Sequence, residues 1–204
     1  ASNSLGIYQK DLKEFARKLS KDDGLAIELF ETGIYEARLL CSRIFNPANL
    51  TEMLVERWTS TFENWEICDS FCMGVYARSP LAISIIHAWA AHEPEFEKRS
   101  AFATLSAYCM ADKYAPNDTF EPFLLLIERE AWDNRIYVKK AVNWALRSIG
   151  KRNIDLRAWA IPMAEEIAQQ ESKAAKRIAR DALKELQSEN VRSSDYPRSV
   201  YRPR

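Results

Sequence analysis

Apolar residues recur at helical spacing along almost the whole chain. Leu12, Ala16 and Leu19, for example, fall on one face of a helix, and later segments repeat this pattern. No stretch alternates convincingly between apolar and polar residues with the two-residue period of a strand. Only 5 of the 204 residues are glycine, so the positive-φ positions of tight β-hairpins are poorly supplied. The sequence therefore predicts an all-α fold.

The expected helices are separated by short polar or proline-containing segments. Thr51 has the side chain of an N-cap, Pro122 suits the first turn of a helix, and Pro162 suits a first turn or a kink. The predicted helical ranges are 12–19, 25–30, 34–44, 51–59, 65–76, 80–91, 95–111, 121–130, 136–149, 155–169 and 172–187. We expect one helical domain over residues 1–187 and an irregular tail, rich in Ser, Pro and Arg, over residues 188–204.

A weak internal repeat becomes visible when the predicted helices are compared. Lys98-Arg99, Lys139-Lys140 and Lys176-Arg177 each open an Ala- and Leu-rich helical stretch, with offsets of 41 and 37 positions. A period of about 40 residues with one helix pair per repeat is typical of HEAT-like repeats. Such pairs stack into a curved solenoid whose concave face suits a long partner. The competing interpretation is that amphipathic helices with basic first turns resemble one another without being repeats.

The charge balance of the chain conceals a strong asymmetry. The 29 Lys and Arg residues equal the 29 Asp and Glu residues, and a net charge of zero argues against a polyanionic partner such as nucleic acid. Residues 137–204, however, contain 15 Lys or Arg against 8 Asp or Glu, a net charge of +7, which leaves −7 for residues 1–136.

Basic residues at successive repeat positions of this C-terminal part are expected to line one side of the solenoid, where they suit backbone phosphates. The alternative is that they form ordinary solvated helix faces. The residues concerned are Lys139, Lys140, Arg147, Lys151, Arg152, Lys173, Lys176, Arg177 and Arg180.

The sequence lacks the features that several functional classes of protein require. Neither GxGxxG nor GxxxxGK[ST] occurs, so Rossmann-type and P-loop nucleotide sites have no motif. No apolar run approaches the roughly 18 residues that span a bilayer, so we expect no membrane partner. Residues 1–10 lack the apolar core of a secretion signal, which predicts a cytoplasmic protein with reduced cysteines. Cys68 and Cys72 precede His87 and His92, but at spacings unlike those of common zinc sites, so we predict no metal and no cofactor.

The segment most informative for chemistry is Asn64-Trp65-Glu66-Ile67-Cys68-Asp69. Trp65 and Asp69 are four residues apart, so they share one face of a helix. A carboxylate beside a large aromatic ring suits a partly apolar cleft with little water. The alternative is a core tryptophan followed by a surface aspartate. Four of the other tryptophans are expected to pack in the core or between helices: Trp58, Trp89, Trp132 and Trp159.

Three segments in consistent order carry a resemblance to a known family. Residues 65–69, 98–101 and 139–147, with the sequences WEICD, KRSA and KKAVNWALR, resemble the bacterial DNA alkylation repair proteins of the AlkD family, which are HEAT-like DNA glycosylases. Supporting similarities lie at residues 5–7, 25–26, 36–38 and 175–183. The resemblance thus covers nearly the whole chain, and it implies an all-α, HEAT-like solenoid with a concave DNA-binding face.

The resemblance also implies an activity and a site. Members of the family excise positively charged alkylpurines, such as N3-methyladenine and N7-methylguanine, from duplex DNA in base excision repair. By this resemblance Asp69 is the catalytic acid, Trp65 and Trp144 are the aromatic walls of the cleft, and Arg99 lies near the DNA backbone. The further DNA-binding residues that we expect are Lys139, Lys140 and Arg147.

The chemistry of the lesion fits a site with one carboxylate. An N3- or N7-alkylated purine already carries positive charge, so its glycosidic bond breaks without a general acid. The enzyme must instead stabilise the positive charge that develops on the sugar, and a fixed carboxylate such as Asp69 does this and can orient water. A second carboxylate is therefore not required. Glu66 adjoins the motif but points about 100° away from Trp65 on a helix, and we interpret it as a neighbour.

Expectations about size, partner and location complete the sequence-based interpretation. Family members usually carry another helical segment before the position of Gly6, so the chain is expected to lack an N-terminal helical segment. The expected partner is double-stranded DNA with alkylated purines, bound by a monomer in the bacterial cytoplasm and on the nucleoid. Two alternatives stay open: a catalytically silent HEAT-like DNA-binding protein, and a HEAT-like scaffold for protein interactions.

Overall fold

The computed structural model describes residues 3–198, and within this range the chain forms helices and no strand. The predicted all-α fold is thereby confirmed. The α-helices are α1 (Gln9–Lys18), α2 (Asp23–Glu31), α3 (Tyr35–Ile44), α4 (Glu52–Thr59), α5 (Trp65–Gly74), α6 (Ala82–Trp89), α7 (Glu95–Ala111), α8 (Glu121–Glu130), α9 (Ile136–Gly150), α10 (Ile154–Ala168) and α11 (Lys173–Leu186). Short 3-10 helices cover Pro47–Asn49, Tyr76–Arg78 and Asn117–Thr119.

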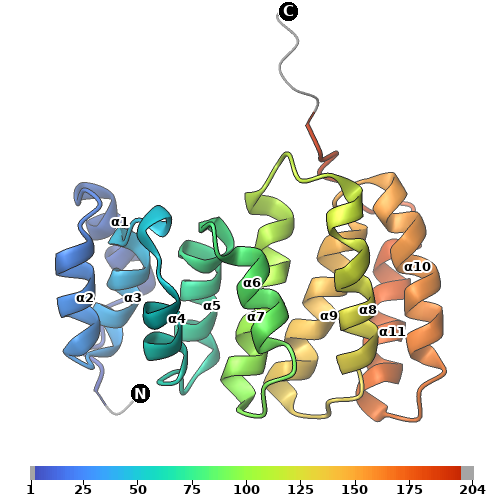
Figure 1. Cartoon of the computed structure of the whole chain (residues 1–204), viewed down its shortest axis with the longest axis horizontal. Helices are drawn as coiled ribbons and strands as arrows, with labels where there is room; N and C mark the ends of the chain where they lie inside the picture. The colour runs from blue at the N-terminus through green and yellow to red at the C-terminus, as the bar shows by residue number, and fades with distance from the viewer. Residues whose placement is uncertain (1–2, 199–204) are drawn as a thin grey trace, which may run out of the picture.

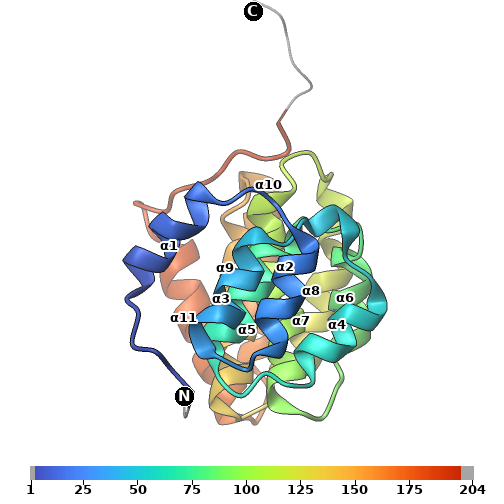
Figure 2. The ribbon, with the colours of Figure 1, turned by 90° about the vertical axis from the view of Figure 1, so that its left-hand side faces the viewer.

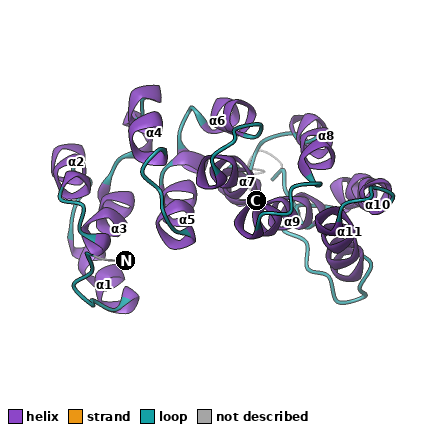
Figure 3. Cartoon of the chain, turned by 90° about the horizontal axis from the view of Figure 1, so that it is seen from below, coloured by secondary structure: helices purple, strands orange, loops and turns teal. Residues whose placement is uncertain are grey.

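The helices stack as consecutive antiparallel pairs along one long axis (Figure 1). Seen along the helices, α3, α5, α7, α9 and α11 form an inner row, while α2, α4, α6, α8 and α10 form an outer row, and the stack is curved (Figure 3). Neighbouring inner helices pack on one another from α3 to α11. Helix α1 packs on α3 and lies to one side of the stacked pairs (Figure 2). This arrangement confirms the predicted HEAT-like solenoid.

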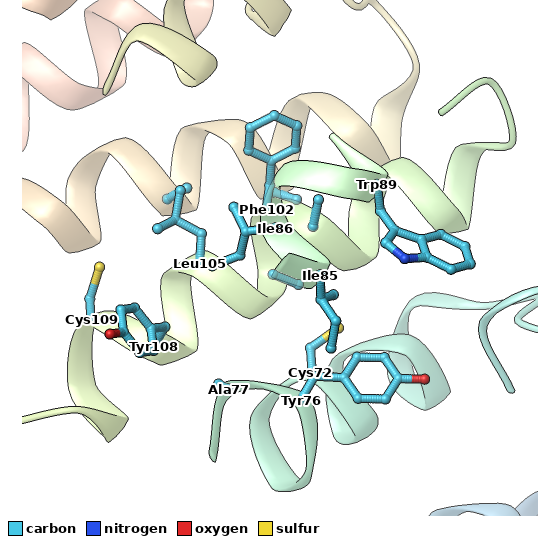
Figure 4. Close-up of a cluster of buried hydrophobic side chains, with 14 of the residues drawn as sticks. Cys72, Tyr76, Ala77, Ile85, Ile86, Trp89, Phe102, Leu105, Tyr108 and Cys109 are labelled. Carbon is cyan, nitrogen blue, oxygen red and sulfur yellow. The ribbon is translucent and has the colours of Figure 1, made fainter. Parts of the chain in front are cut away.

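Helix α7 lies at the centre of the stack, where it packs on α5, α6 and α9. Of its 17 residues, 11 are buried, so it is enclosed on nearly all sides. Phe102 and Leu105 of α7 meet Ile85 and Ile86 of α6 in one apolar cluster (Figure 4). An amphipathic stripe is enough for a surface helix, whereas a central repeat helix must satisfy several neighbours, which explains the all-round burial.

Most helix ends follow the local signals in the sequence. The Thr51 side chain accepts a hydrogen bond from the Leu54 N–H and caps α4 as expected. The bounds of α7 and α8 coincide with the predicted ranges, while α6 starts at Ala82 rather than at residue 80. Pro162 lies inside α10 rather than in its first turn. The shift at α6 is small, whereas the first-turn position expected for Pro162 was wrong, because α10 already begins at Ile154.

Two of the tryptophans expected to pack in the core or between helices do not. Trp58 and Trp89 are buried as predicted, but Trp132 is 56% exposed and Trp159 is 38% exposed. Helical spacing alone gives the face of a residue and not the position of that face in the stack, which is why these two predictions were wrong.

The described part of the tail, residues 188–198, has no helix but packs closely against the last repeats. The N–H groups of Ser194 and Tyr196 donate to the carbonyls of Lys151 and Arg152, at 2.9 and 3.1 Å. The Arg152 side chain is fully buried, and its guanidinium lies 5.4 Å from the centre of the Tyr196 ring. Arg152 therefore belongs to the core, and its expected place on a basic surface was wrong.

Segment 4–7 is held to α3 by a single buried carboxylate, that of Glu36. This carboxylate accepts hydrogen bonds from the Ser4 hydroxyl at 2.6 Å and from the N–H groups of Leu5 and Gly6, both at 2.9 Å. Burial alone would raise the pKa of Glu36, but these hydrogen bonds lower it to about 2. Glu36 thus fixes the approach of the chain to α1.

In residues 3–198 no helix is long and apolar enough to cross a bilayer.

The first prediction concerns the acid sensitivity of this anchor. Because the pKa of Glu36 is about 2 in the folded protein against an ordinary 4.5, its stabilisation is present above pH 4.5 and is lost as the pH falls toward 2. Glu36→Gln should remove most of the anchor at neutral pH, and amide exchange over residues 5–7 should become about 10-fold faster, as expected for loss of a hydrogen bond to a charged group. Unchanged exchange in Glu36→Gln, measured by mass spectrometry, would contradict this role.

The second prediction concerns the close approach of α3 and α5 at Gly74. A Cβ atom at Gly74 would lie 2.6 Å from the Ser42 carbonyl oxygen, which is backbone and cannot move aside. Gly74→Ala should therefore reduce the free energy of unfolding by about 1–3 kcal/mol, the usual cost of overpacking. Gly24→Ala is the matched control, because the nearest atom to its Cβ is a side-chain oxygen at 3.5 Å. Equal stability of the two variants in urea titrations would refute the argument.

Candidate functional site

The first two turns of α5 present Trp65 and Asp69 on the same side of the helix. The Asn64 side chain caps this turn by accepting from the N–H groups of Glu66 and Ile67, each at 3.0 Å. Ile67 then points into the core, while Trp65 is 51% exposed and the Asp69 side chain is 16% exposed. The interpretation of Trp65 as a core anchor followed by a surface aspartate therefore does not describe this helix.

Asp69 forms a two-point ion pair with Arg99 of α7. The Arg99 Nε atom donates to Asp69 Oδ1 at 2.9 Å, and the Nη2 atom donates to Oδ2 at 2.8 Å. The Arg99 Nη1 atom donates to the carbonyl of Tyr137, in the first turn of α9, at 2.7 Å. One guanidinium thus joins α5, α7 and α9 and holds the carboxylate in a single orientation.

The electrostatics of the pair favour a fixed carboxylate. Burial raises the pKa of Asp69 above its ordinary value, although the hydrogen bonds and positive charge of Arg99 act in the opposite direction. The pKa of Arg99 is raised by Asp69 although its own burial opposes this, so the arginine stays charged. Each carboxylate oxygen has two lone pairs, and the ion pair uses one of them on each oxygen. Asp69 therefore keeps acceptor capacity on the side away from Arg99.

The residue next to Arg99 secures the start of α9. The Lys98 Nζ atom lies 2.6 Å from Glu130 and 3.2 Å from Asp133, and all three side chains are buried. The Tyr137 N–H donates to the Glu95 side chain at 3.0 Å. Because the Tyr137 carbonyl is also a partner of Arg99, these contacts help to set the geometry of the ion pair.

Trp65 and Asp69 line a cavity of about 1060 Å³ between α1, α3 and α5. Met73 and Gly74 continue its wall along α5. The volume lies near the upper end of the range for small-molecule sites, and the wall combines an aromatic face, a carboxylate and several cations. Such a cavity can take a charged, planar group together with part of a polar chain.

The other predicted site residues lie elsewhere. Arg147 pairs with Glu185 at 2.6 Å and lines a second cavity of about 620 Å³ with Lys151 and Lys184. Trp144 is half-buried on α9 and packs on the core, Lys139 is half-buried and Lys140 is exposed. These last three residues line neither of the two cavities. The structure therefore joins Trp65, Asp69 and Arg99 in one place and leaves the rest at other points of the solenoid.

Glu66 faces α1 and α3 rather than Asp69. Its carboxylate accepts from the Gln9 side chain at 2.7 Å and from the Tyr35 hydroxyl, and burial together with this contact raises the pKa of Tyr35. Glu66 thus connects α1, α3 and α5.

Within residues 3–198 no group of three His, Cys, Asp or Glu side chains is arranged to hold a metal ion.

Sequence reasoning missed the cations on the wall of the larger cavity. Five basic side chains line it, all from residues that precede position 137: Lys13, Arg17, Lys21, Arg43 and Arg78. Only the spacing of Lys13 and Arg17, four residues apart on one helix, hinted at a shared face. The net negative charge of this half of the chain concealed the group.

A family model and a solved structure agree with this architecture. The family model described as "DNA alkylation repair enzyme" matches residues 2–187. A solved structure described as belonging to "a new family of proteins related to the HEAT-like repeat DNA glycosylases with affinity for branched DNA structures" matches with a TM-score of 0.71 and 19% identity, over 89% of this chain and 82% of that one. A designed armadillo repeat protein matches with a TM-score of 0.34 and 12% identity, over 88% of this chain and 95% of its own. No curated protein sequence matches.

The third prediction tests the energetic role of Arg99. Arg99→Ala should reduce the free energy of unfolding by about 3 kcal/mol or more, because it leaves a buried carboxylate without its partner. Arg57→Ala is the matched control: Arg57 pairs with Glu31 at 2.8 Å, but both side chains are largely exposed, and such pairs contribute about 0–1 kcal/mol. A loss no larger for Arg99→Ala than for Arg57→Ala in denaturant titrations would count against a structural role of the buried pair.

Proposed function

We propose, from the premise that this chain belongs to the family of DNA alkylation repair enzymes, that it is a monofunctional DNA glycosylase for positively charged alkylpurines. Its substrates would be N3- and N7-alkylated purines in duplex DNA. The observation that carries the proposal is the Asp69 carboxylate, held by Arg99 beside the exposed face of Trp65 at the wall of a large cavity.

The reaction that this geometry suits is cleavage of the bond between C1′ of the sugar and the alkylated purine. The electron pair of that bond leaves with the base, which becomes neutral because it was cationic before. The sugar then carries oxocarbenium-like positive charge, and the Asp69 carboxylate stabilises it at short range. Water adds to C1′ and loses its proton, a step in which Asp69 orients the water or accepts the proton.

The aromatic side chains have a complementary role in this proposal. The exposed face of Trp65, one turn before Asp69, is available to a cationic base or to the sugar through cation–π and CH contacts. Trp144 is the second aromatic residue that we assign to the DNA-binding surface, together with Lys139, Lys140 and Arg147. These residues would contact the duplex away from the reacting bond.

Arg99 acts through Asp69 in this mechanism. Three of its donors are already engaged by Asp69 and Tyr137, and its side chain is only 6% exposed. We therefore assign Arg99 as a positioning residue, which replaces the sequence-based expectation of a contact to the DNA backbone. The guanidinium orients the carboxylate and keeps it ionised next to the developing charge on the sugar.

The partner in this proposal is double-stranded DNA, bound by a monomer in the cytoplasm or on the nucleoid. The similar solved structure is described as having affinity for branched DNA, which makes a silent DNA-binding protein the main competing function. A solenoid that only binds proteins is the other competitor. Release of methylated purine from alkylated DNA separates the glycosylase from both.

The fourth prediction is the direct test of this assignment. Asp69→Asn keeps the shape and removes the charge, so it should retain DNA binding and slow the release of 7-methylguanine by about 100-fold or more, as for other charge-stabilising groups. The rate is measured under single-turnover conditions on a duplex with one lesion. Glu56→Gln, which removes an exposed carboxylate from the outer helix α4, should act like the wild type. Base release by Asp69→Asn at the wild-type rate would refute the assignment of Asp69 as the catalytic carboxylate.

A further inference from the structure

Five cations gather around the cavity that Asp69 lines, and we call them the N-terminal basic cluster. Lys13 and Arg17 project from α1, Lys21 lies in the loop after it, Arg43 comes from α3, and Arg78 ends the 3-10 helix Tyr76–Arg78. Of the two carboxylates on the same wall, Asp69 is paired with Arg99, whereas Glu66 is hydrogen-bonded to the neutral side chains of Gln9 and Tyr35 and keeps its negative charge. The cavity therefore has an excess of positive charge.

None of the five cations has a carboxylate within 4.0 Å in residues 3–198. The Lys21 ammonium donates to two backbone carbonyls at 2.8 and 2.9 Å, Arg43 donates to the Gln9 amide at 2.8 Å, and Arg78 donates to a backbone carbonyl at 3.1 Å. Neutral partners of this kind leave the positive charge uncompensated.

The C-terminal basic residues are in a different electrostatic state. Arg147 and Lys151 both pair with Glu185 at 2.6 Å, and the Arg177 and Arg180 side chains lie 3.6 Å from Asp181. Each of these two carboxylates thus neutralises one charge of its two basic partners, whereas none of the five cations of the N-terminal basic cluster has a carboxylate partner. The cavity beside Asp69 is therefore a further concentration of positive charge, within the part of the chain whose net charge is −7.

The cluster is also under electrostatic stress that an anion would relieve. Burial, and then the charge of Arg78, lower the pKa of Lys21 against the opposing charge of Asp23, and burial lowers the pKa of Arg43 against the opposing charge of Glu66. Like charges that share one cavity repel each other, and a bound polyanion removes this repulsion while it releases its own counterions. The space is continuous with Asp69 and Trp65, so an anion held there would be connected to whatever occupies the candidate site.

We propose that the N-terminal basic cluster binds backbone phosphates of the DNA segment adjoining the nucleotide held at Asp69. This inference rests on the proposed function, because it takes DNA as the partner. The polymer that places a sugar at Asp69 carries a phosphate on each side of that sugar, and the cations lie on the same cavity wall. The cluster contributes affinity and register and carries no sequence information.

The fifth prediction measures the number of phosphate contacts. The triple variant Lys13→Gln, Arg17→Gln and Arg78→Gln changes three exposed cations of the cluster. For an unmodified duplex, the slope of log affinity against log salt concentration should become less steep by about 0.9 per lost contact, or nearly 3 in total. The matched control, Lys18→Gln, Arg57→Gln and Arg129→Gln, removes the same charge from exposed side chains outside the cavity and should change the slope by less than 1.

A proximity measurement gives a second, independent readout. The native cysteines at 41, 68, 72 and 109 are all buried, so a thiol-reactive benzophenone can be attached selectively to Met73→Cys, on the cavity wall. Irradiation should crosslink this protein to duplex DNA. The same label at Met53→Cys, on the outer helix α4, should give no more crosslink than labelled wild type.

The outcomes separate this inference from the proposed function. Equal slopes for the two triple variants, or equal crosslinking at positions 73 and 53, would overturn the phosphate site even if base release is intact. A reduced slope and a position-73 crosslink in a protein without base release would support the site and refute the glycosylase. Failure of the wild type to bind duplex, with binding of polyglutamate at the cluster, would indicate an acidic protein partner and overturn the inference.

Discussion

The ion pair between Asp69 and Arg99 is the interaction on which the candidate site depends. It spans the two inner helices α5 and α7, and the remaining contact of Arg99 with the Tyr137 carbonyl adds α9. A buried pair of this kind gains little net stability, because both charges lose their hydration. Its contribution is geometric: it places one carboxylate, in one orientation, on the wall of the cavity between α1, α3 and α5.

Two adjacent residues of α7 form buried ion pairs with different neighbouring elements. Consecutive side chains on a helix point about 100° apart, so Lys98 reaches Glu130 and Asp133 while Arg99 reaches Asp69. Lys98 thereby fixes the segment that precedes α9, and Arg99 fixes the site itself. The dense burial of α7 keeps both side chains in place, which links the packing of the solenoid to the position of its candidate catalytic group.

The sequence predicted those parts of the structure that local signals determine. Periodicity and the positions of the prolines placed α7 and α8 at their observed bounds, and the four-residue spacing put Trp65 and Asp69 on one face. Contacts between residues that are distant in the sequence could not be predicted from these local signals. Arg99 and Arg152 read as surface cations, yet one neutralises a carboxylate 30 residues away and the other is fully buried. The net charges of the two parts of the chain did not reveal the basic cluster, because a total ignores which cations have carboxylate partners.

The central claim is that Arg99 acts on the reaction through Asp69, and a double-mutant cycle tests it most directly. Single-turnover release of 7-methylguanine from duplex DNA is measured for wild type, Asp69→Asn, Arg99→Lys and the double variant. Arg99→Lys should slow release in the wild-type background, because a single ammonium cannot reproduce the two-point contact, and should add little when Asp69→Asn is present. Effects that multiply independently in the double variant would contradict the account.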